Sequence, residues 1–363
     1  MKLPASPKRS AAPFNVCVLV GLLIFAAASG CGSRAGDDGT ITVRMATLFG
    51  KKHHLAKKLE WMAKELEDRS DGRFECQVFP GGIIGGETQN LHDLKSGSLE
   101  LMNGAGSVLY LQVPEAAVIE LPFYEWKDKH EARATIRGYW QQLTEVSKKK
   151  GYYPVALDIR DYWGVYYREP IDSLDAVKAA KFRSVNAELW SEITKLYDAV
   201  PNPIPYAEAY MAFKTGVTDG SLGSVTGATA ANWHEVLKCY LDTRLVLSHS
   251  FTLTSQEWLD GLPPDLRELF LQVAEESEEF NVTTVEEQYR KNKQTMLDAG
   301  VKWVNYEDLD LSQLRERSRA FREDYMKQKG PEVYDFYQNW IKHVEQSTGR
   351  SQGAAAPTLD SVL

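Results

Sequence analysis

The stretch from Lys181 to Gly220 constrains the fold of this chain more than any other part of the sequence. It predicts a strand that carries an arginine, then a helix, a connection stiffened by three prolines, a second helix and a turn. Because successive side chains of a strand point to opposite faces, Phe182 is expected to pack inward and Arg183 to face a cleft. This order of elements places a cation at the mouth of the cleft, with an aromatic residue opposite it.

Strands and helices alternate along the N-terminal part of the chain, which predicts an α/β fold with parallel strands joined by helical crossovers. The expected elements are a strand over 41–46, a helix over 53–69, a strand over 73–79, a helix over 87–95 and a strand over 98–102. About 330 residues follow the first 30, which is more than one typical core holds, so we expect two lobes.

The C-terminal part is predicted to be helical. Pro263-Pro264 starts a helix at the position that proline favours, and the helical pattern continues to Leu297. At 1.5 Å per residue such a helix is roughly 50 Å long, so it either bends or packs across both lobes. Two amphipathic helices are expected over 311–329 and 331–346, and residues 347–363 are expected to form a disordered tail.

The N-terminus has the features of a targeting segment. Basic residues precede an apolar run from Val16 to Ala28, which is too short to span a bilayer comfortably. Small residues then lead to Cys31 in the manner of a lipobox, so residues 1–30 are predicted to be a lipoprotein signal peptide and Cys31 a lipidated N-terminus. Residues 31–40 then form a flexible tether. The alternative is an ordinary secretory cleavage at which Cys31 is incidental.

Charge and cysteine content exclude some classes of function. Removing residues 1–30 removes three of the 42 basic side chains and none of the 50 acidic ones, which leaves a net charge of −11. Such a chain does not favour nucleic acid, and an anionic ligand would need a local cation. Cys76 and Cys239 remain besides Cys31, and their spacing suggests no metal site. One disulfide between them and two free thiols both fit the sequence.

The stretch that begins at Lys181 resembles the signature of solute-binding proteins of TRAP transporters (the DctP type). That pattern runs roughly K-[IMF]-R and then A-x-P-x-P-x-[PS]-[FY]-x-E-x-Y-x-A-[LF]-x-[TN]-G-x-x-D-G. The matching residues are Lys181, Phe182, Arg183, Ala199, Pro201, Pro203, Pro205, Tyr206, Glu208, Tyr210, Ala212, Phe213, Gly216, Asp219 and Gly220. The N-terminal part resembles the family more loosely, at Phe79-Pro80, Ile84-Gly85 and Leu121-Pro122-Phe123.

The resemblance implies a two-lobed fold like that of periplasmic binding proteins, with a cleft between the lobes and a long helix that crosses both. Lobe I would comprise residues 41–157 with about 247–278, and lobe II residues 158–246 with about 279–346. The family shows His-Pro where this chain has His53-His54. Neighbouring residues of a helix point roughly 100° apart, so this pair is not expected to chelate a metal, and no cofactor is expected.

The resemblance also implies the ligand contacts. The arginine at the position of Arg183 pairs with the ligand carboxylate, which its planar guanidinium matches in shape. Asn186 falls where some members place a polar side chain on the ligand, and Tyr206 matches an aromatic residue that lines the pocket. Closure of the lobes on a small organic acid would bridge Arg183 and main-chain groups near Asn103 to Ser107.

Two departures from the family pattern affect the choice of ligand. A second arginine of the family falls at Tyr162 here, while Arg160 lies two residues away and is near enough to replace it. A family asparagine falls at Gly223, which is expected to enlarge the pocket, and Trp163 adds to its aromatic walls. We therefore expect an aromatic or branched carboxylate rather than a C4-dicarboxylate or sialic acid.

The function that these features predict is that of a solute-binding subunit outside the cytoplasm, held at a membrane face through Cys31, which delivers its ligand to the membrane subunits of a TRAP transporter. A lipid-anchored module that presents the bound solute to a membrane sensor kinase is the alternative. An enzyme is disfavoured, since the chain carries no nucleophile elbow, P-loop, dinucleotide-binding or zincin motif.

Overall fold

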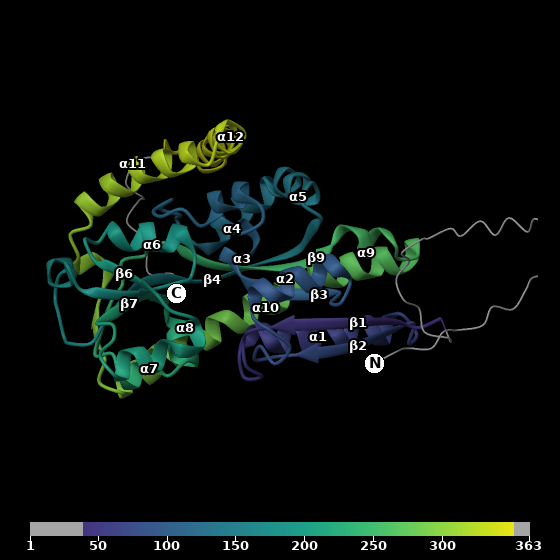
Figure 1. Cartoon of the computed structure of the whole chain (residues 1–363), viewed down its shortest axis with the longest axis horizontal. Coiled ribbons are helices and arrows are strands. Elements are labelled where there is room, and N and C mark those ends of the chain that lie inside the picture. Colours follow the sequence, from purple (N-terminus) through teal and green to yellow (C-terminus); the bar gives the residue numbers. More distant parts are fainter. Residues whose placement is uncertain (1–38, 352–363) are drawn as a thin grey trace, which may run out of the picture. The chain divides into compact units, whose positions relative to one another are not determined.

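The computed structural model describes residues 39–351 (Figure 1). The predicted signal peptide, the lipidated Cys31, most of the tether and most of the C-terminal tail lie outside the described residues. The strands are β1 (Ile41–Thr47), β2 (Phe74–Phe79), β3 (Leu101–Ala105), β4 (Tyr152–Tyr167), β5 (Lys181–Ser184), β6 (Val200–Pro203), β7 (Gly220–Ser224), β8 (Cys239–Leu241), β9 (Leu247–Ser255) and β10 (Lys302–Val304).

One sheet contains all of these strands, in the order β2-β1-β3-β9-β4-β7-β5-β6, with β8 added to β4 and β10 added to β8. β1 pairs in parallel with β2 and with β3, as the alternation of strands and helices predicted. The long strand β4 pairs with β9 through its first part and with β7 and β8 through its last part. β4 therefore joins an N-terminal half of the sheet to a C-terminal half.

The helices whose limits were predicted begin and end close to those limits. The helices are α1 (His54–Arg69), α2 (Glu87–Ser96), α3 (Gly106–Tyr110), α4 (Lys129–Gly138), α5 (Trp140–Lys148), α6 (Glu188–Lys195), α7 (Ala209–Lys214), α8 (Val225–Ala230), α9 (Gln256–Asp260), α10 (Pro264–Asp298), α11 (Ser312–Gln328) and α12 (Pro331–Thr348). Short 3-10 turns span Pro114–Ile119, Leu174–Val177, Tyr206–Glu208, Trp233–Glu235 and Tyr306–Asp308.

The predicted start of the third strand at residue 98 is wrong. β3 starts at Leu101, because the N–H groups of Ser98 and Leu99 donate to the carbonyl of Asp93 at 2.8 and 3.1 Å and so complete the end of α2. These bonds satisfy a carbonyl that the helix itself leaves without a partner.

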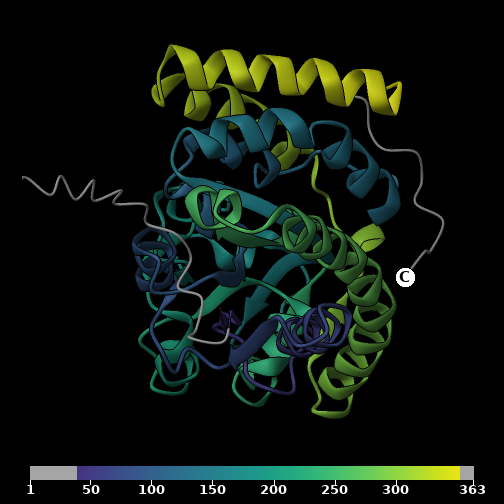
Figure 2. The same ribbon diagram turned by 90° about the vertical axis from the view of Figure 1, so that its right-hand side faces the viewer.

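Helix α10 packs against both halves of the molecule (Figures 1 and 2). Its first half contributes Leu266, Phe270 and Val273 to a core shared with α1, β1 and β2. Further along, Tyr289 and Met296 join a second core around β4 and β8. The prediction that this helix crosses both lobes is confirmed, whereas the exact lobe boundaries stay a prediction.

Helices α11 and α12 form an outer layer. α12 contacts α4 and the turn Pro114–Ile119, and the two views show both helices lying over this part of the molecule. Trp340 of α12 is fully buried and makes edge contacts with Tyr124 and Tyr139. None of the helices between residues 39 and 351 has both the length and the apolar character needed to cross a bilayer. Cys76 and Cys239 are both free thiols.

Candidate functional site

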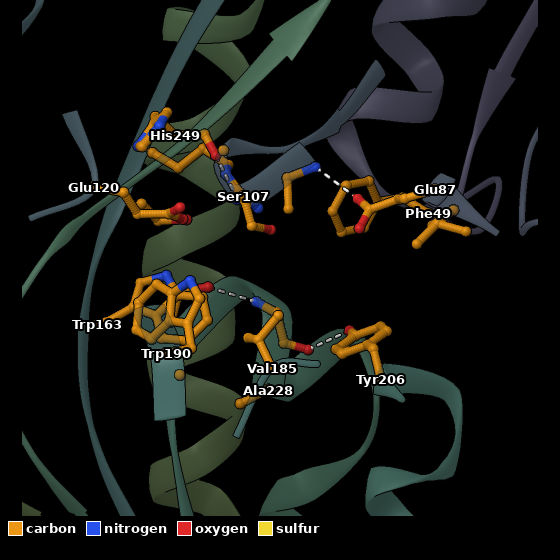
Figure 3. Close-up of a pocket in the computed structure, with 18 of the residues that line it drawn as sticks. Phe49, Glu87, Ser107, Glu120, Trp163, Val185, Trp190, Tyr206, Ala228 and His249 are labelled. Carbon is orange, nitrogen blue, oxygen red and sulfur yellow. Dashed lines mark hydrogen bonds between the residues drawn. The ribbon is translucent and has the colours of Figure 1, made fainter. Parts of the chain in front are cut away.

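A cavity lies where loops and strand ends from both halves of the sheet meet. The volume of this cavity is about 100 Å³. Figure 3 shows Phe49, Glu87, Ser107, Glu120 and His249 facing Trp163, Trp190, Val185, Tyr206 and Ala228 across it. The remaining lining residues are Leu48, Ala105, Gly106, Arg160, Arg183, Gly223, Ser224, Gly227, Trp233 and Ser248.

Arg183 reaches the cavity from β5 as the alternation of the strand predicted, while Phe182 is fully buried. The guanidinium Nε donates to the carbonyl of Ile204 at 2.9 Å, and its carbon lies 5.9 Å from the ring of Trp233. Within residues 39–351, its two terminal nitrogens have no hydrogen-bond or ion-pair partner. Burial lowers the pKa of Arg183 to about 10, so the group is charged at neutral pH and has lost most of its water.

Arg160 lines the same cavity, and Tyr162 does not. The register of β4 against β9 shifts between Ile159 and Tyr162, which marks a β-bulge. A bulge inserts an extra residue and re-aims the side chains that follow it, so both Arg160 and Trp163 face the cavity. Nη2 of Arg160 donates to the carbonyl of His249 at 3.1 Å, and burial lowers the pKa of the guanidinium.

An aromatic wall lines the side of the cavity that the C-terminal half contributes. The rings of Trp163 and Trp190 stack with their centroids 4.0 Å apart. The hydroxyl of Tyr206 donates to the carbonyl of Gly227 at 2.7 Å, which fixes the orientation of that ring. The predicted pocket residues Trp163 and Tyr206 therefore lie together at this wall, joined by Trp190 from α6.

Gly223 lines the cavity, but it does not enlarge it. A Cβ atom at this position would lie 2.8 Å from Cζ3 of Trp233, which is too short for a contact between two non-bonded carbon atoms. The missing side chain makes room for the Trp233 ring, which is 2% exposed and itself lines the cavity. The expectation of a larger pocket is wrong, because the indole of Trp233 occupies the space that the missing side chain leaves.

Two carboxyl groups lie in the lining with the two arginines: that of Glu87, which is half-buried, and that of Glu120, which is buried. Oε1 of Glu87 accepts the N–H of Ala105 at 2.8 Å, and burial raises the pKa of this carboxyl. Burial also raises the pKa of Glu120, to about 8. Neither residue was predicted as a contact. The available signal for Glu120 was a lone acid inside an apolar run, immediately before Leu121-Pro122-Phe123.

Ser107, a predicted ligand contact, lies in the lining and is 4% exposed.

Asn103 lies outside the lining, because its amide donates to Asp158 and to Thr252 at 3.1 and 2.9 Å. Asn186 is exposed in the loop after β5 and is absent from the lining, where Val185 occupies the nearest position. The structure thus brings together six of the eight predicted contacts, leaving out Asn186 and Tyr162.

The adjacent histidines lie behind one wall of the cavity. The ring of His53 stacks on that of Phe49 at 4.1 Å and on that of His54 at 4.3 Å. Nδ1 of His54 lies 2.7 Å from Oδ1 of Asn281, near the middle of α10. The two histidines therefore pack behind Phe49, which lines the cavity.

A two-lobed α/β fold with a buried, cation-lined cavity between its halves defines the class of solute-binding proteins. Residues 45–329 match the family model DctP, described as "Bacterial extracellular solute-binding protein, family 7". The chain therefore belongs to this family, and the resemblance seen in the sequence is confirmed.

Relatives and solved structures agree with this assignment. A solute-binding protein of Chromohalobacter salexigens is 25% identical over 266 residues, which cover 71% of this chain and 77% of the relative. A TRAP periplasmic solute-binding protein from the same species, solved with bound D-glucuronate, has a TM-score of 0.77 at 22% identity and covers 83% of this chain and 99% of that one.

Another, from Desulfovibrio salexigens with bound orotic acid, has a TM-score of 0.79 at 18% identity and covers 84% of this chain and 99% of that one. Both structures confirm the two-lobed fold.

Proposed function

We propose that this protein captures a small organic carboxylate in the cavity between its lobes and delivers it to the membrane subunits of a TRAP-type transporter. The observation that carries the proposal is the pair of buried guanidiniums, Arg160 and Arg183. Within the described residues, neither forms an ion pair with a protein carboxylate. Buried charges are normally paired, so two unpaired cations in one cavity favour an anionic ligand.

Arg183 is the better anchor of the two. Its two terminal nitrogens can donate hydrogen bonds to both oxygens of one carboxylate. This bidentate arrangement makes arginine–carboxylate pairs strong and directional. At an effective dielectric near 20, an ion pair at 4 Å contributes about 4 kcal/mol before desolvation. Arg160 adds a second positive charge to the same cavity.

The aromatic wall favours a ring-shaped acid. Trp163, Trp190 and Tyr206 present flat apolar faces, against which an aromatic ring or the apolar face of a sugar ring packs well. D-glucuronate and orotic acid, bound in the two similar structures, are both ring acids with a carboxylate. This supports an aromatic or cyclic acid over an open-chain C4-dicarboxylate.

The proposal is one of binding, not of catalysis. Membership of a solute-binding family supports it. Anchoring through lipidated Cys31 belongs to the proposal, since that residue lies outside the described part of the chain. Mass spectrometry of the protein purified from membranes would test the anchor.

A thermal-shift screen tests the ligand class. The panel contains D-glucuronate, orotate, benzoate, succinate and malate, and ligand binding raises the unfolding temperature as affinity rises. We expect the ring acids to stabilise the protein most. Stabilisation by succinate or malate alone would contradict the preference for a ring, and no stabilisation by any carboxylate would contradict the proposed function.

Arg183→Ala is expected to weaken binding of the best acid by on the order of 100-fold or more, because removing one partner of a buried charge pair costs about 2–5 kcal/mol. Titration calorimetry measures the loss. Arg267→Ala is the matched control, since Arg267 is 39% exposed, pairs with Asp260 and lies outside the cavity. Equal affinity of the Arg183→Ala variant and wild type would exclude Arg183 as the anchor.

A further inference from the structure

Glu120 is the residue of the cavity that the carboxylate-binding function leaves unexplained. It follows the turn Pro114–Ile119, is 5% exposed and lines the cavity together with Arg160 and Arg183. Figure 3 shows its carboxyl group on the same side as Ser107 and His249, opposite the two stacked tryptophans. Its Oε2 has no hydrogen-bond partner among the residues that the structure describes.

An ionised Glu120 would fit poorly beside a carboxylate ligand. Like charges held close together in a desolvated site repel strongly, and an unpaired ionised carboxylate is costly to bury. A protonated carboxyl group avoids both costs and gains an O–H donor. A donor at this position can bind a ligand oxygen that is not part of the ligand's own carboxylate.

The groups around Glu120 come from five elements. Glu87 of α2 is a second acid, and the positive charge of Arg160 of β4 favours ionisation. The Trp190 indole of α6 lies near enough to favour the ionised form as well, although its N–H has no hydrogen-bond partner of good geometry among the described residues. Tyr110 of α3 and Tyr325 of α11 are neutral phenols whose pKa values are raised chiefly by burial.

We propose that Glu120 is a ligand-binding residue that stays protonated, and that its O–H donates a hydrogen bond to an oxygen of the ligand remote from the anchored carboxylate. The cavity would thereby select acids that carry a hydroxyl, carbonyl or ring oxygen over hydrocarbon acids of the same shape. The inference rests on the proposed function, since it places the ligand carboxylate at Arg183.

The balance of effects on the carboxyl group supports this assignment. Burial is the largest influence on Glu120 and raises its pKa to about 8, against the opposing effect of Arg160. The carboxyl is therefore mostly protonated at pH 7 and mostly ionised at pH 9. His249 and Tyr206 change little over that range, since the pKa of His249 is lowered to about 4 and that of Tyr206 is raised to about 12.

The test compares matched acids and two variants by titration calorimetry. The probe is the panel acid that binds wild type best, D-glucuronate or orotate, paired with the ring acid that lacks its additional oxygens, cyclohexanecarboxylate or benzoate. Wild type should prefer the oxygenated acid at pH 7. Glu120→Ala should weaken binding of that acid by about 10-fold and leave binding of its hydrocarbon partner nearly unchanged, as expected for one lost hydrogen bond.

Glu120→Gln provides the decisive comparison, because its amide keeps a donor and does not titrate. It should restore the affinity that Glu120→Ala loses. Wild-type affinity should fall about 10-fold from pH 7 to pH 9, since the fraction of protonated Glu120 falls by that factor, whereas the glutamine variant should show a flat profile.

The outcomes separate this inference from the proposed function. If the carboxylates bind but wild type shows no decline above pH 8, or if the alanine variant binds the oxygenated acid as tightly as wild type, the assignment of Glu120 is wrong and the proposed function stands. If no carboxylate binds to wild type at pH 7, the proposed function fails and this inference fails with it. A uniform loss for both acids in the alanine variant would indicate a purely structural role and would also overturn the assignment.

Discussion

At the scale of single residues, the contact between Gly223 and Trp233 determines the shape of the cavity. The indole packs where a side chain would otherwise project from β7, and the same ring lies 5.9 Å from the guanidinium carbon of Arg183. A cation over an aromatic face is stabilised by the ring quadrupole. Gly223 therefore affects the anchor indirectly, through the ring that it admits.

We expect Gly223→Ala to lower the free energy of unfolding by about 1–3 kcal/mol, the usual cost of forcing extra atoms into a packed core. The displaced indole should also weaken carboxylate binding. Urea denaturation and calorimetry measure the two effects. Gly50→Ala is the control, because a Cβ atom there meets nothing within 4 Å. Equal stability of the two variants would show that the Trp233 ring moves aside at no cost.

The sequence predicted the site well where its residues are close together in the chain. Arg183 and Tyr206 belong to one contiguous signature, so their approach follows from local structure. Arg160 reaches the cavity through a β-bulge, a local irregularity that the sequence did not reveal. Trp233 and Glu120 come from separate turns, and only the tertiary fold brings them to one cavity.

At the scale of elements, a buried ion pair fixes helix α1 to strand β4. Nζ of Lys58 donates to Oδ1 and Oδ2 of Asp158 at 2.8 and 2.7 Å, and both side chains are fully buried. Thr252 of β9 and Asn103 of β3 complete the network. Since Asp158 lies two residues before Arg160, the network also holds the part of β4 that supplies the second cation.

Lys58→Met is expected to lower the free energy of unfolding by about 3–5 kcal/mol, because it leaves the carboxylate of Asp158 buried without its cation. The double variant Lys58→Met with Asp158→Leu should recover much of that loss, since replacing both members of a buried pair by apolar groups is often neutral. Chemical denaturation of the ligand-free proteins compares them. A double variant no more stable than the single one would show that the unpaired carboxylate of Asp158 is not the cause of the loss.

The limits of the predicted helices were close to the observed ones, because amphipathic periodicity and helix-ending residues are local. α10 starts at Pro264 and ends at Asp298, close to the predicted limits. The strand order was not predictable in the same way. β9 lies antiparallel between β3 and β4, and both of these partners are far from it in the sequence.

At the scale of the whole molecule, three buried histidines make stability depend on pH. His53, His54 and His249 are 6%, 1% and 3% exposed. Burial, together with the charge of Arg160, lowers the pKa of all three, that of His54 to about 3 and that of His249 to about 4. The folded protein therefore keeps these rings neutral at a pH where the unfolded chain, with a pKa of about 6.5, takes up protons.

The sign of the effect follows from this difference in protonation. Below pH 6.5 the unfolded state binds more protons than the folded state, so the free energy of unfolding falls as the pH falls towards 4. A histidine such as His249 contributes about 1 kcal/mol per pH unit in that window. The protonated Glu120 acts in the opposite direction, because burial raises its pKa from 4.5 to about 8. Its contribution to stability is full below pH 4.5 and is lost as the pH rises from there through 8.

His249→Gln isolates one histidine from the other titrating groups. We expect the free energy of unfolding of wild type to fall relative to this variant by about 1 kcal/mol for each pH unit between 6 and 4.5. The glutamine keeps a polar side chain opposite Gly106, whose Cα packs against the His249 ring. Urea denaturation at half-unit steps of pH gives both profiles, and parallel curves would show that His249 is not neutral in the folded protein.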